Sequence, residues 1–538
     1  MSNDWFFEKF ASIADAPGAV ARMRELVLDL AVRGKLMPQD PNEEPAKETL
    51  KRVDAEREQL VKAKGIRRHD TLGPVPVEAI PFAIPVNWQW CYLADVCFLI
   101  TDGAHHTPQY LESGVPFLSV KDVSRGSIDF SSTRYISEEA HRELCKRCQP
   151  ELGDVLLTKV GTTGIAVNVE DDRDFSIFVS LALLKFSQPN LDGRFLTYLI
   201  NSPFVRQQSA KNTQGIGNKN LVLRLINRFI VPLPPIAEQK RIVAKVEELM
   251  GICDALEAQQ QERESRKSVL VRSSLSRFAE SPTPENLGYL FHKSYDIPPS
   301  ELRKSILTLA VQGKLVPQDS NDEPASSILE ATQTFFKRLV AEKKLSEPKP
   351  LPRIDDHEEP FSLPPGWEWC RLGHVIRISS GDGLIAKDMV DGLVPVYGGN
   401  GVNGYHNRNN VAKRTLVIGR VGFYCGSIHI TPAKAWVTDN AFITTFNDQH
   451  LDLDFLSWLL KATDLRKRDN ATAQPVISGA KIYPTILALP PLVEQRRIVA
   501  KVDQLMALVD ELERQQEASR EKASKLLDAI VQEMTSGG

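Results

Sequence analysis

The chain has 538 residues, too many for one hydrophobic core, and this length favours three or four domain-sized units. Its 42% hydrophobic and 25% charged residues are typical of a globular protein, and charged residues interrupt every apolar run before it could cross a bilayer. A net charge of −3 excludes a polycation, so binding to a polyanion would need basic residues gathered locally. Seven cysteines without regular spacing, and a start at Met1 without a signal-peptide pattern, predict a cytoplasmic protein with no membrane partner.

Two helices are predicted at the start of the chain. Residues 22–33 carry apolar side chains with a period of 3.6 residues, and Gly34 ends that run. Residues 45–64 are charged and helix-prone, and this second helix is expected to end near Gly65.

A β-rich region follows between Trp88 and Pro235. Short runs of β-branched and apolar residues alternate there with Gly, Asn and Asp turns, and residues 154–158 are a strand candidate. Residues 195–200 are a helix candidate within the same region. We therefore predict an α+β domain between the tryptophan and the proline.

The strongest helical pattern comes next, at residues 236–278. One continuous helix of this length would span roughly 64 Å. Its apolar residues form a heptad seam that occurs a second time near the end of the chain, which favours antiparallel packing of the two copies against each other. An ordinary core stripe and a self-associating coiled coil are the alternatives. The seam residues are Ile242, Val246, Leu249, Cys253 and Leu256, and then Ile498, Val502, Leu505, Val509 and Leu512.

The second half of the chain repeats the first, after a linker at 281–299 that contains four prolines. The box Ala-Val-x-Gly-Lys-Leu-x-Pro-Gln-Asp at 31–40 returns at 310–319, and Trp-x-Trp-Cys at 88–91 returns at 367–370, both with an offset of 279. The later motif Leu-Pro-Pro-x-x-Glu-Gln returns with an offset of 256, so the second copy is 23 residues shorter between these motifs. Its own candidates are helices at 324–344 and 455–460 and a strand at 415–418.

The chain therefore contains two different β-rich inserts, and each insert lies within the same frame of repeated motifs and is followed by Leu-Pro-Pro-x-x-Glu-Gln and a long helix. This arrangement resembles the specificity subunit of Type I restriction-modification enzymes. The repeated box at 31–40 and 310–319 resembles one branch of that family, and the resemblance covers nearly the whole chain. It implies an α+β fold in which two α/β target-recognition domains are separated by two long antiparallel helices, with an internal pseudo-twofold repeat. The corresponding division is 1–86 and 281–365 for the helical regions, 87–235 and 366–491 for the target-recognition domains, and 236–280 and 492–538 for the spacer helices.

The resemblance also implies partners and cofactors. Each target-recognition domain would read one half of a split site in double-stranded DNA, and the spacer helices would dock two methyltransferase subunits, which the endonuclease-translocase subunits join. The methyltransferase partner would use S-adenosylmethionine and the nuclease partner ATP and Mg, whereas this chain would hold no cofactor. The docking positions would be Glu238, Gln239, Ile242, Val246, Glu494, Gln495, Ile498 and Val502.

Physical reasoning supports a split site independently of the resemblance. Two readers on one face of a duplex must stand about one helical turn, roughly 34 Å, or a multiple apart. A stiff pair of helices would set that distance, whereas a flexible linker would blur it. Different inserts predict an asymmetric site, and the internal repeat predicts two equivalent docking faces for the methyltransferase.

The candidate DNA contacts of the first insert lie in three loops. Lys159 stands between a strand end and a glycine, where a basic side chain can reach a phosphate or the O6/N7 edge of guanine. The alternatives are that the loop histidines are merely solvated and that the polar loop before Pro235 is a simple connector. The full set is His105, His106, Lys159, Thr162, Thr163, Asn218, Lys219 and Asn220.

In the second insert, Arg420 matches Lys159 in position and is predicted to play the same part. The run 398–410 is rich in Gly and Asn, and asparagine can pair with adenine in the major groove while arginine pairs with guanine or phosphate. Asn400-Gly401 and Asn403-Gly404 are also predicted to form tight hairpin turns, which is compatible with DNA contact. The candidates of this run are Asn400, Asn403, Tyr405 and Arg408.

No motif predicts catalysis or metal binding in this chain. The Gly-x-Gly-x-x-Gly pattern at 399–404 opens no helix, no ATP-binding P-loop is present, and Cys145-x-x-Cys148 is a lone pair beside His141. Three other functions remain open: the recognition subunit of a Type IIB-like enzyme, an enzyme with cryptic nuclease or methylase activity, and a helical scaffold that binds only protein. The partner polypeptides would identify the first, cofactor binding by the isolated chain the second, and the two unlike inserts argue against the third.

Overall fold

The computed structural model describes residues 16, 18–64, 72–215, 219–280, 283, 286, 297–466 and 476–536. The chain divides into two compact units, the first made of Met1–Arg263 and Ser519–Gly538 and the second of Glu264–Ala518. The boundaries fall inside two long helices, α10 (Ile236–Glu280) and α17 (Leu492–Ser536). Each unit therefore contains the first part of one long helix and the last part of the other.

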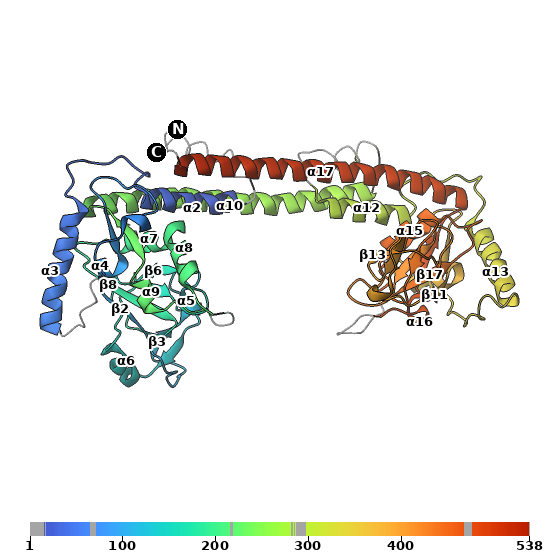
Figure 1. The fold of residues 1–538 in the computed structure, drawn as a ribbon. Helices are drawn as coiled ribbons and strands as arrows, with labels where there is room; N and C mark the ends of the chain where they lie inside the picture. The colour runs from blue at the N-terminus through green and yellow to red at the C-terminus, as the bar shows by residue number, and fades with distance from the viewer. Residues whose placement is uncertain are drawn as a thin grey trace. The chain divides into compact units, whose positions relative to one another are not determined.

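In the first unit, α2 (Ala19–Val32) lies along α10 (Figure 1). Arg24 of α2 forms ion pairs with Asp254 and Glu257 of α10, with N–O distances of 2.6 and 2.7 Å. The next helix, α3 (Ala46–Lys64), packs on the short helix α4 (Leu93–Val96). Both helices predicted for the start of the chain are therefore confirmed, to within a few residues at their ends.

The second unit repeats this arrangement with α12 (Pro299–Val311) and α13 (Ala325–Ala341). Arg303 of α12 forms ion pairs with Asp510 and Glu513 of α17 at 2.6 and 2.7 Å, in the same geometry as Arg24. The helix predicted for 324–344 is confirmed as α13.

The heptad seams of both long helices are buried as predicted. In the first unit, the seam of α10 shares one core with Leu527 of α17, so the last turns of α17 run beside the first turns of α10. In the second unit, Val271 and Phe278 of α10 share a core with the seam of α17. Antiparallel packing of the two helices is thus present within each unit. The fully buried seam residues are Ile242, Val246, Leu249 and Cys253, and Ile498, Val502, Leu505 and Val509; Leu256 and Leu512 are partly buried.

The β domain of the first unit contains three sheets. A four-stranded antiparallel sheet has the order β2-β8-β5-β6, a three-stranded sheet has the order β4-β3-β7 with β3 and β7 parallel, and β1 pairs with β9 at the base. The strands are β1 (Gln89–Tyr92), β2 (Cys97–Asp102), β3 (Val115–Leu118), β4 (Arg134–Ile136), β5 (Val155–Thr158), β6 (Ala166–Asn168), β7 (Ser176–Ile177), β8 (Leu181–Phe186) and β9 (Ile230–Leu233). The helices are α5 (Val120–Val123), α6 (Glu138–Cys145), α7 (Gly193–Asn201), α8 (Pro203–Asn212) and α9 (Leu223–Ile226), preceded by a 3-10 turn at Val77–Ala79.

The β domain of the second unit has the same topology. Its sheets have the orders β11-β17-β14-β15, β13-β12-β16 and β10-β18, so each strand has a counterpart in the first unit. The strands are β10 (Glu368–Arg371), β11 (Arg377–Ser380), β12 (Val394–Gly398), β13 (Gly401–His406), β14 (Leu416–Gly419), β15 (Ile428–Ile430), β16 (Trp436–Val437), β17 (Ala441–Thr445) and β18 (Ile486–Leu489). The helices are α14 (Leu372–Val375), α15 (Leu453–Ala462) and α16 (Gly479–Ile482), with 3-10 turns at Asp356–Glu358 and Ala386–Asp388.

The central strands β5 and β14 are buried on both faces. In β5, Val155 and Leu157 pack into the large core shared with the helices, whereas Leu156 packs into a second core on the other face. This alternation follows from the two-residue period of a strand, and burial on both faces explains the continuous apolar run. The strands predicted at 154–158 and 415–418 and the helices predicted at 195–200 and 455–460 are all confirmed, and the α+β fold class with them.

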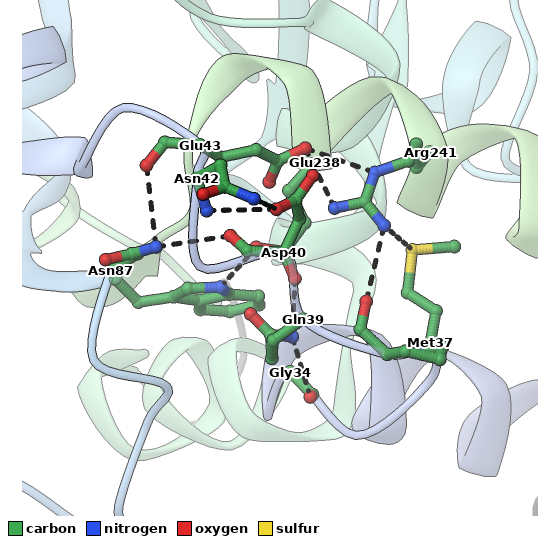
Figure 2. Close-up of polar contacts among 11 residues, drawn as sticks. Gly34, Met37, Gln39, Asp40, Asn42, Glu43, Asn87, Glu238 and Arg241 are labelled. Carbon is green, nitrogen blue, oxygen red and sulfur yellow. Dashed lines mark hydrogen bonds and ion pairs between the residues drawn. The ribbon is translucent and has the colours of Figure 1, made fainter.

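The repeated Glu-Gln pair forms a buried junction between each long helix and the loops around it. Glu238 accepts hydrogen bonds from Trp88 Nε1 at 2.8 Å and from Gln39 Nε2 at 2.6 Å, and Arg241 pairs with Glu43 at 2.9 Å (Figure 2). Gln239 accepts from the backbone N–H of Asp192, the N-cap residue of α7, at 2.9 Å. Burial raises the pKa of Glu238 above its ordinary value.

The second unit contains the same junction. Glu494 accepts from Trp367 Nε1 at 3.0 Å and from Gln318 Nε2 at 2.9 Å, and Gln495 accepts from the N–H of Asp452, which caps α15, at 2.9 Å. Burial also raises the pKa of Glu494. The repeated sequence motifs are therefore explained by packing, because the box, the tryptophan and the Glu-Gln pair meet in one place in each unit.

Within the described residues, no helix combines the length and the apolar composition that crossing a membrane requires.

Candidate nucleic-acid interface

In the first unit, the loop after β5 is held against two other segments by main-chain hydrogen bonds. The N–H of Lys159 donates to Ser180 O at 2.9 Å, and Lys159 O accepts from Leu221 N at 2.7 Å. The loop then turns back on itself, since Gly164 N donates to Thr158 O at 2.8 Å. The polar segment near Asn220 thus lies beside the 158–164 loop, as an isolated bridge between Val160 and Asn220 also shows.

The side chain of Lys159 points inward to Asp102, the last residue of β2. Lys159 Nζ lies 3.0 Å from Asp102 Oδ2, and both side chains are buried. Arg147 Nη2 and His105 Nε2 approach the other carboxylate oxygen at 2.5 and 3.0 Å. Burial alone would raise the pKa of Asp102, but the hydrogen bonds from Lys159 and His105 outweigh burial and hold the pKa below its ordinary value.

This arrangement gives the three basic side chains different roles. The charge of Lys159 is neutralised by Asp102 inside the domain, so its ammonium group is not directed at solvent. Arg147 is 55% exposed and shares the same carboxylate, which leaves an excess of positive charge at the surface. A phosphate could therefore approach Arg147, and His105 beside it, more readily than Lys159.

The other candidates of the first unit are mostly exposed. His106, Thr162 and Lys219 are exposed, whereas Thr163 and Asn220 are half-buried. Thr163 Oγ1 lies 2.9 Å from Thr213 Oγ1, so this hydroxyl already has a partner. Asn218 lies outside the described residues. The structure brings the 158–164 loop together with His105 and with Lys219 and Asn220, and direct DNA contact by these residues stays a prediction.

In the second unit, the loop after β14 has equivalent main-chain hydrogen bonds. Arg420 N donates to Asn440 O at 2.9 Å, Arg420 O accepts from Ile477 N at 3.0 Å, and Gly426 N donates to Gly419 O at 2.7 Å. The sequence match between Lys159 and Arg420 is thus a structural match as well.

The side chain of Arg420 has a different environment from that of Lys159. The position equivalent to Asp102 is Ser380, whose Oγ lies 3.4 Å from Arg420 Nη1, and the backbone oxygen of Asp439 lies at 3.3 Å. The guanidinium carbon stands 5.4 Å from the centre of the Phe442 ring. Across the described ranges no carboxylate forms an ion pair with Arg420, so none of the described carboxylates neutralises its charge.

The Asn-rich run of the second unit forms the hairpin of β12 and β13. Asn400 is exposed in the turn between these strands, and the turn packs on the 419–426 loop because Ser427 Oγ donates to Gly399 O at 2.7 Å. The second predicted turn is wrong: Asn403-Gly404 lies inside β13, opposite a register shift at Val396/Tyr397, because the irregularity is absorbed within the ladder.

The remaining candidates of that hairpin lie on its exposed side. Asn403, Tyr405 and Arg408 are all exposed, and Tyr405 retains 59% of its accessible surface. The structure therefore brings Asn400 next to the Arg420 loop and places the other three further along β13 or just beyond its end.

The positions predicted to dock methyltransferase subunits are buried within their own units. The two Glu-Gln pairs bond inside the junctions described above, and the four apolar residues belong to the helix cores. Docking on α10 and α17 stays a prediction, and exposed residues of these helices would have to provide the contacts. The buried positions are Glu238, Gln239, Ile242 and Val246, and Glu494, Gln495, Ile498 and Val502.

Four residues that the sequence analysis did not select belong to this candidate interface: Asp102, Arg147, Phe423 and Tyr424. Asp102 precedes the His105 loop directly, and a carboxylate at a strand end could have suggested a partner for a nearby lysine. Phe423 and Tyr424 follow Arg420 between two glycines, and two adjacent aromatic residues at such a place are an available signal. Arg147, far along the chain from Asp102, gave none.

The described residues contain no group of three or more His, Cys, Asp or Glu side chains placed to hold a metal ion. Cys145 Sγ lies 3.5 Å from the ring nitrogens of His141, but Cys148 is buried and burial raises its pKa to about 12. A thiol held in its protonated form is a poor metal ligand.

Comparisons with known proteins find Type I restriction-modification specificity subunits and domains. The family model described as "Type I restriction modification DNA specificity domain" matches residues 85–263 and 364–520. The chain is 32% identical to the Type I restriction enzyme EcoAI specificity subunit of Escherichia coli, over 67% of this chain and 63% of that protein, which is less than two thirds of the relative. It is 27% identical to the EcoEI specificity subunit of Escherichia coli, over 95% of this chain and 93% of that protein. A solved chain from a study of the assembly and conformational transition of the type I R-M system is 20% identical, with a TM-score of 0.49, over 85% of this chain and 100% of that chain.

Proposed function

The chain belongs to the Type I restriction modification DNA specificity family, and we propose that it is the DNA-reading subunit of a Type I restriction-modification complex in which each unit reads one half of a split, asymmetric site. One observation carries this proposal. The family model matches twice, once in the β domain of each unit, and the two domains have the same strand order but differently built loops. Two readers that share a scaffold and differ at their loops suit two different half-sites.

Contacts with the DNA backbone and bases are assigned to the loops of the candidate interface. In the second unit, Arg420 carries a charge without a carboxylate partner among the described residues, and the exposed Asn400 stands in the neighbouring turn. In the first unit, Arg147 and His105 are the exposed members of the Asp102 cluster. Because the net charge of the chain is −3, binding to phosphate needs local groupings of basic residues such as these.

The internal repeat supports the proposed partners. Each unit presents the same frame of box, tryptophan, Glu-Gln junction and long helix, and two like frames in one chain suit two copies of one partner. We assign that partner as the methyltransferase subunit, which the endonuclease-translocase subunit would join. S-adenosylmethionine would be bound by the methyltransferase and ATP with Mg by the nuclease, whereas this chain is assigned recognition and no catalytic step.

Co-expression with the methyltransferase encoded beside this chain tests the proposal. Single-molecule sequencing of the host DNA should find a split, asymmetric motif with a modified adenine in each half, and the modification should vanish when this chain is omitted. A stable complex that modifies no DNA would contradict the reading role. Failure to form any complex would instead favour a protein-binding scaffold, and a single partner polypeptide with both methylase and nuclease activity would favour the Type IIB-like arrangement.

A further inference from the structure

The loop after β14 contains a hydrogen-bonded turn with two aromatic side chains at its tip. Cys425 N donates to Gly422 O at 3.0 Å, which closes a turn over residues 422–425 with Phe423 and Tyr424 at its two central positions. Gly422 has a φ of +85°, a conformation that strongly favours glycine, and Cys425 is buried in the core of the second unit. The turn is therefore fixed on both sides of the two rings.

Both rings are held out in solvent. Phe423 is 78% exposed and Tyr424 is 52% exposed, and their ring centres lie 5.1 Å apart in an edge-to-face arrangement with an angle of 86°. Scattered surface residues of this kind need no explanation, but two adjacent aromatic rings at the centre of a fixed turn form a small preformed apolar contact surface.

The surroundings of this tip are basic and polar. Arg420 stands at the start of the same loop without a carboxylate partner in the described part of the unit. Exposed Arg466 lies beside Gly426 at its other end, since a Cβ placed on Gly426 would lie 3.4 Å from Arg466 Cγ. The exposed turn that carries Asn400 packs on the loop through Ser427. Two aromatic residues are far too few for a stable protein interface, which buries about 800 Å² on each partner.

The equivalent loop of the first unit has matching main-chain bonds at its basic residue and at the strand end, but it has a different tip. Its turn between Gly161 and Gly164 carries Thr162 and Thr163, one residue fewer than the turn between Gly422 and Gly426. Both glycines that open these turns have positive φ, 81° and 85°. The scaffold of the loop is thus repeated while the chemistry of its tip is not, which is the pattern expected of positions that distinguish two DNA sequences.

We propose that Phe423 and Tyr424 are specificity-determining residues whose rings contact the 5-methyl groups of thymine in the half-site read by the second unit. This inference rests on the proposed function. The thymine methyl is the apolar group that base pairs expose in the major groove, and aromatic side chains contact it there. Arg420 and Arg466 would bind the flanking phosphates and position the tip, as phosphate contacts generally do.

The test uses the complex of the full chain with its methyltransferase subunits and duplexes that contain the motif found by methylation sequencing. The variant carries Phe423→Thr and Tyr424→Thr, which introduces the threonine pair of the first unit. Because both rings are exposed, the variant should fold and assemble normally. Leu393→Thr is the matched control, since Leu393 is 93% exposed just before β12, at the opposite end of that strand from the Asn400 turn.

Two measurements decide the outcome. For the wild-type complex, replacing thymine by deoxyuridine in the second half-site should weaken binding, and the double variant should be insensitive to that replacement. The double variant should also lose discrimination against base-pair changes in the second half-site by about 5- to 150-fold, the range of one mismatched pair, and keep its discrimination in the first half-site. The control should behave as wild type in both measurements.

Three results would overturn the inference: no response of the wild-type complex to deoxyuridine, unchanged discrimination by the double variant, or an equal loss in both half-sites. A second half-site without thymine on either strand would overturn it as well. Failure of the proposed function is distinguishable from all of these, because the wild-type complex would then show no preference for any duplex.

Discussion

The loop after β5 in the first unit and the loop after β14 in the second unit have matching main-chain hydrogen bonds at their basic residue, but the side chain of that residue has a different environment in each loop. Lys159 is buried against the carboxylate of Asp102, whereas among the described residues Arg420 contacts the hydroxyl of Ser380, a backbone oxygen and the Phe442 ring but no carboxylate. The residue at the end of the neighbouring strand, Asp102 or Ser380, determines whether the basic side chain forms an ion pair within the described part of the unit. Residues at equivalent positions on equivalent backbones can therefore have different roles: Lys159 stabilises its loop, whereas Arg420 is left available to a ligand.

The largest expected effect comes from the glycine that follows this position in each unit. A Cβ on Gly103 would lie 1.9 Å from Ile177 O, and a Cβ on Gly381 would lie 2.2 Å from Val437 O, both backbone atoms that cannot move aside cheaply. We expect Gly103→Ala to destabilise the first unit by more than about 4 kcal/mol and Gly381→Ala to do the same to the second. Hydrogen–deuterium exchange of peptides from β2 and β11 reports each unit separately.

The control for this pair is Gly251→Ala in α10, where an added Cβ meets no atom within 4 Å. It should stabilise the helix by roughly 0.5–1 kcal/mol. Unchanged protection of β2 in the Gly103 variant, or of β11 in the Gly381 variant, would show that the loop site of that unit does not depend on this close strand contact.

The next effect separates the two basic residues by stability. Asp102→Asn leaves Lys159 buried without a carboxylate of its own, and breaking a buried ion pair costs about 3–5 kcal/mol. Ser380→Ala, at the equivalent position, removes only a 3.4 Å contact and should change stability little. Denaturant unfolding of the two variants checks this difference, and equal losses would mean that Asp102 is not the partner that holds Lys159.

A smaller effect separates the two residues by DNA affinity. Arg420→Gln should weaken DNA binding of the assembled complex to a similar extent for all sequences and reduce the slope of log K against log salt by about 1, the result of losing one phosphate contact. Lys159→Gln should leave the salt slope unchanged, since Asp102 already neutralises that ammonium group. Binding titrations at several salt concentrations test both variants, and a reduced slope for Lys159→Gln would reverse the assignment.

The smallest effect concerns the frame that the two units share. Burial raises the pKa of Glu238 above the ordinary value of 4.5, which means that the folded state favours the protonated carboxyl group. The contribution of this group to the stability of the fold is therefore fully present below pH 4.5 and is lost as the pH rises through the raised pKa. The difference in Tm between wild type and Glu238→Gln should therefore be larger near pH 4.5 than near pH 7.5. Glu494→Gln should behave alike, and a difference that grows with pH would contradict the direction of both shifts.

Most of the frame could be predicted from the sequence because its signals are local and repeated. The period of the seam from Ile242 to Leu256 predicts both the long helix and its buried face, and a second copy predicts the antiparallel neighbour. The role of Glu238 and Gln239 could not be predicted, since their partners Trp88 and Asp192 are distant in the chain. Polar residues on an expected docking helix proved to be buried parts of a junction.

The candidate site was predictable at the level of loops but not of individual side chains. Lys159 and Arg420 could be matched by the strand and glycine around them. The residue that determines whether their charge is paired comes from another strand, however, and Asp102 lies 57 residues away from Lys159 in the chain. The Asn403-Gly404 pair failed as a turn because a strand can absorb an irregularity that looks like a turn in sequence. Such outcomes depend on strand pairing, which short β-strands signal weakly.

Exchanging one target domain for the other tests most directly whether each unit reads its own half-site. The exchange points lie next to the strand pairs β1–β9 and β10–β18. At these points Leu93 N donates to Phe229 O at 2.8 Å in the first unit, and Leu372 N donates to Thr485 O at 2.7 Å in the second. A chain in which residues 93–229 are replaced by residues 372–485 keeps both frames and carries the second reader twice. Sequencing of DNA modified by its complex with the methyltransferase should find the second half-site twice and the first not at all. An unchanged asymmetric motif, or modification that still requires the first half-site, would contradict the assignment of one half-site to each unit.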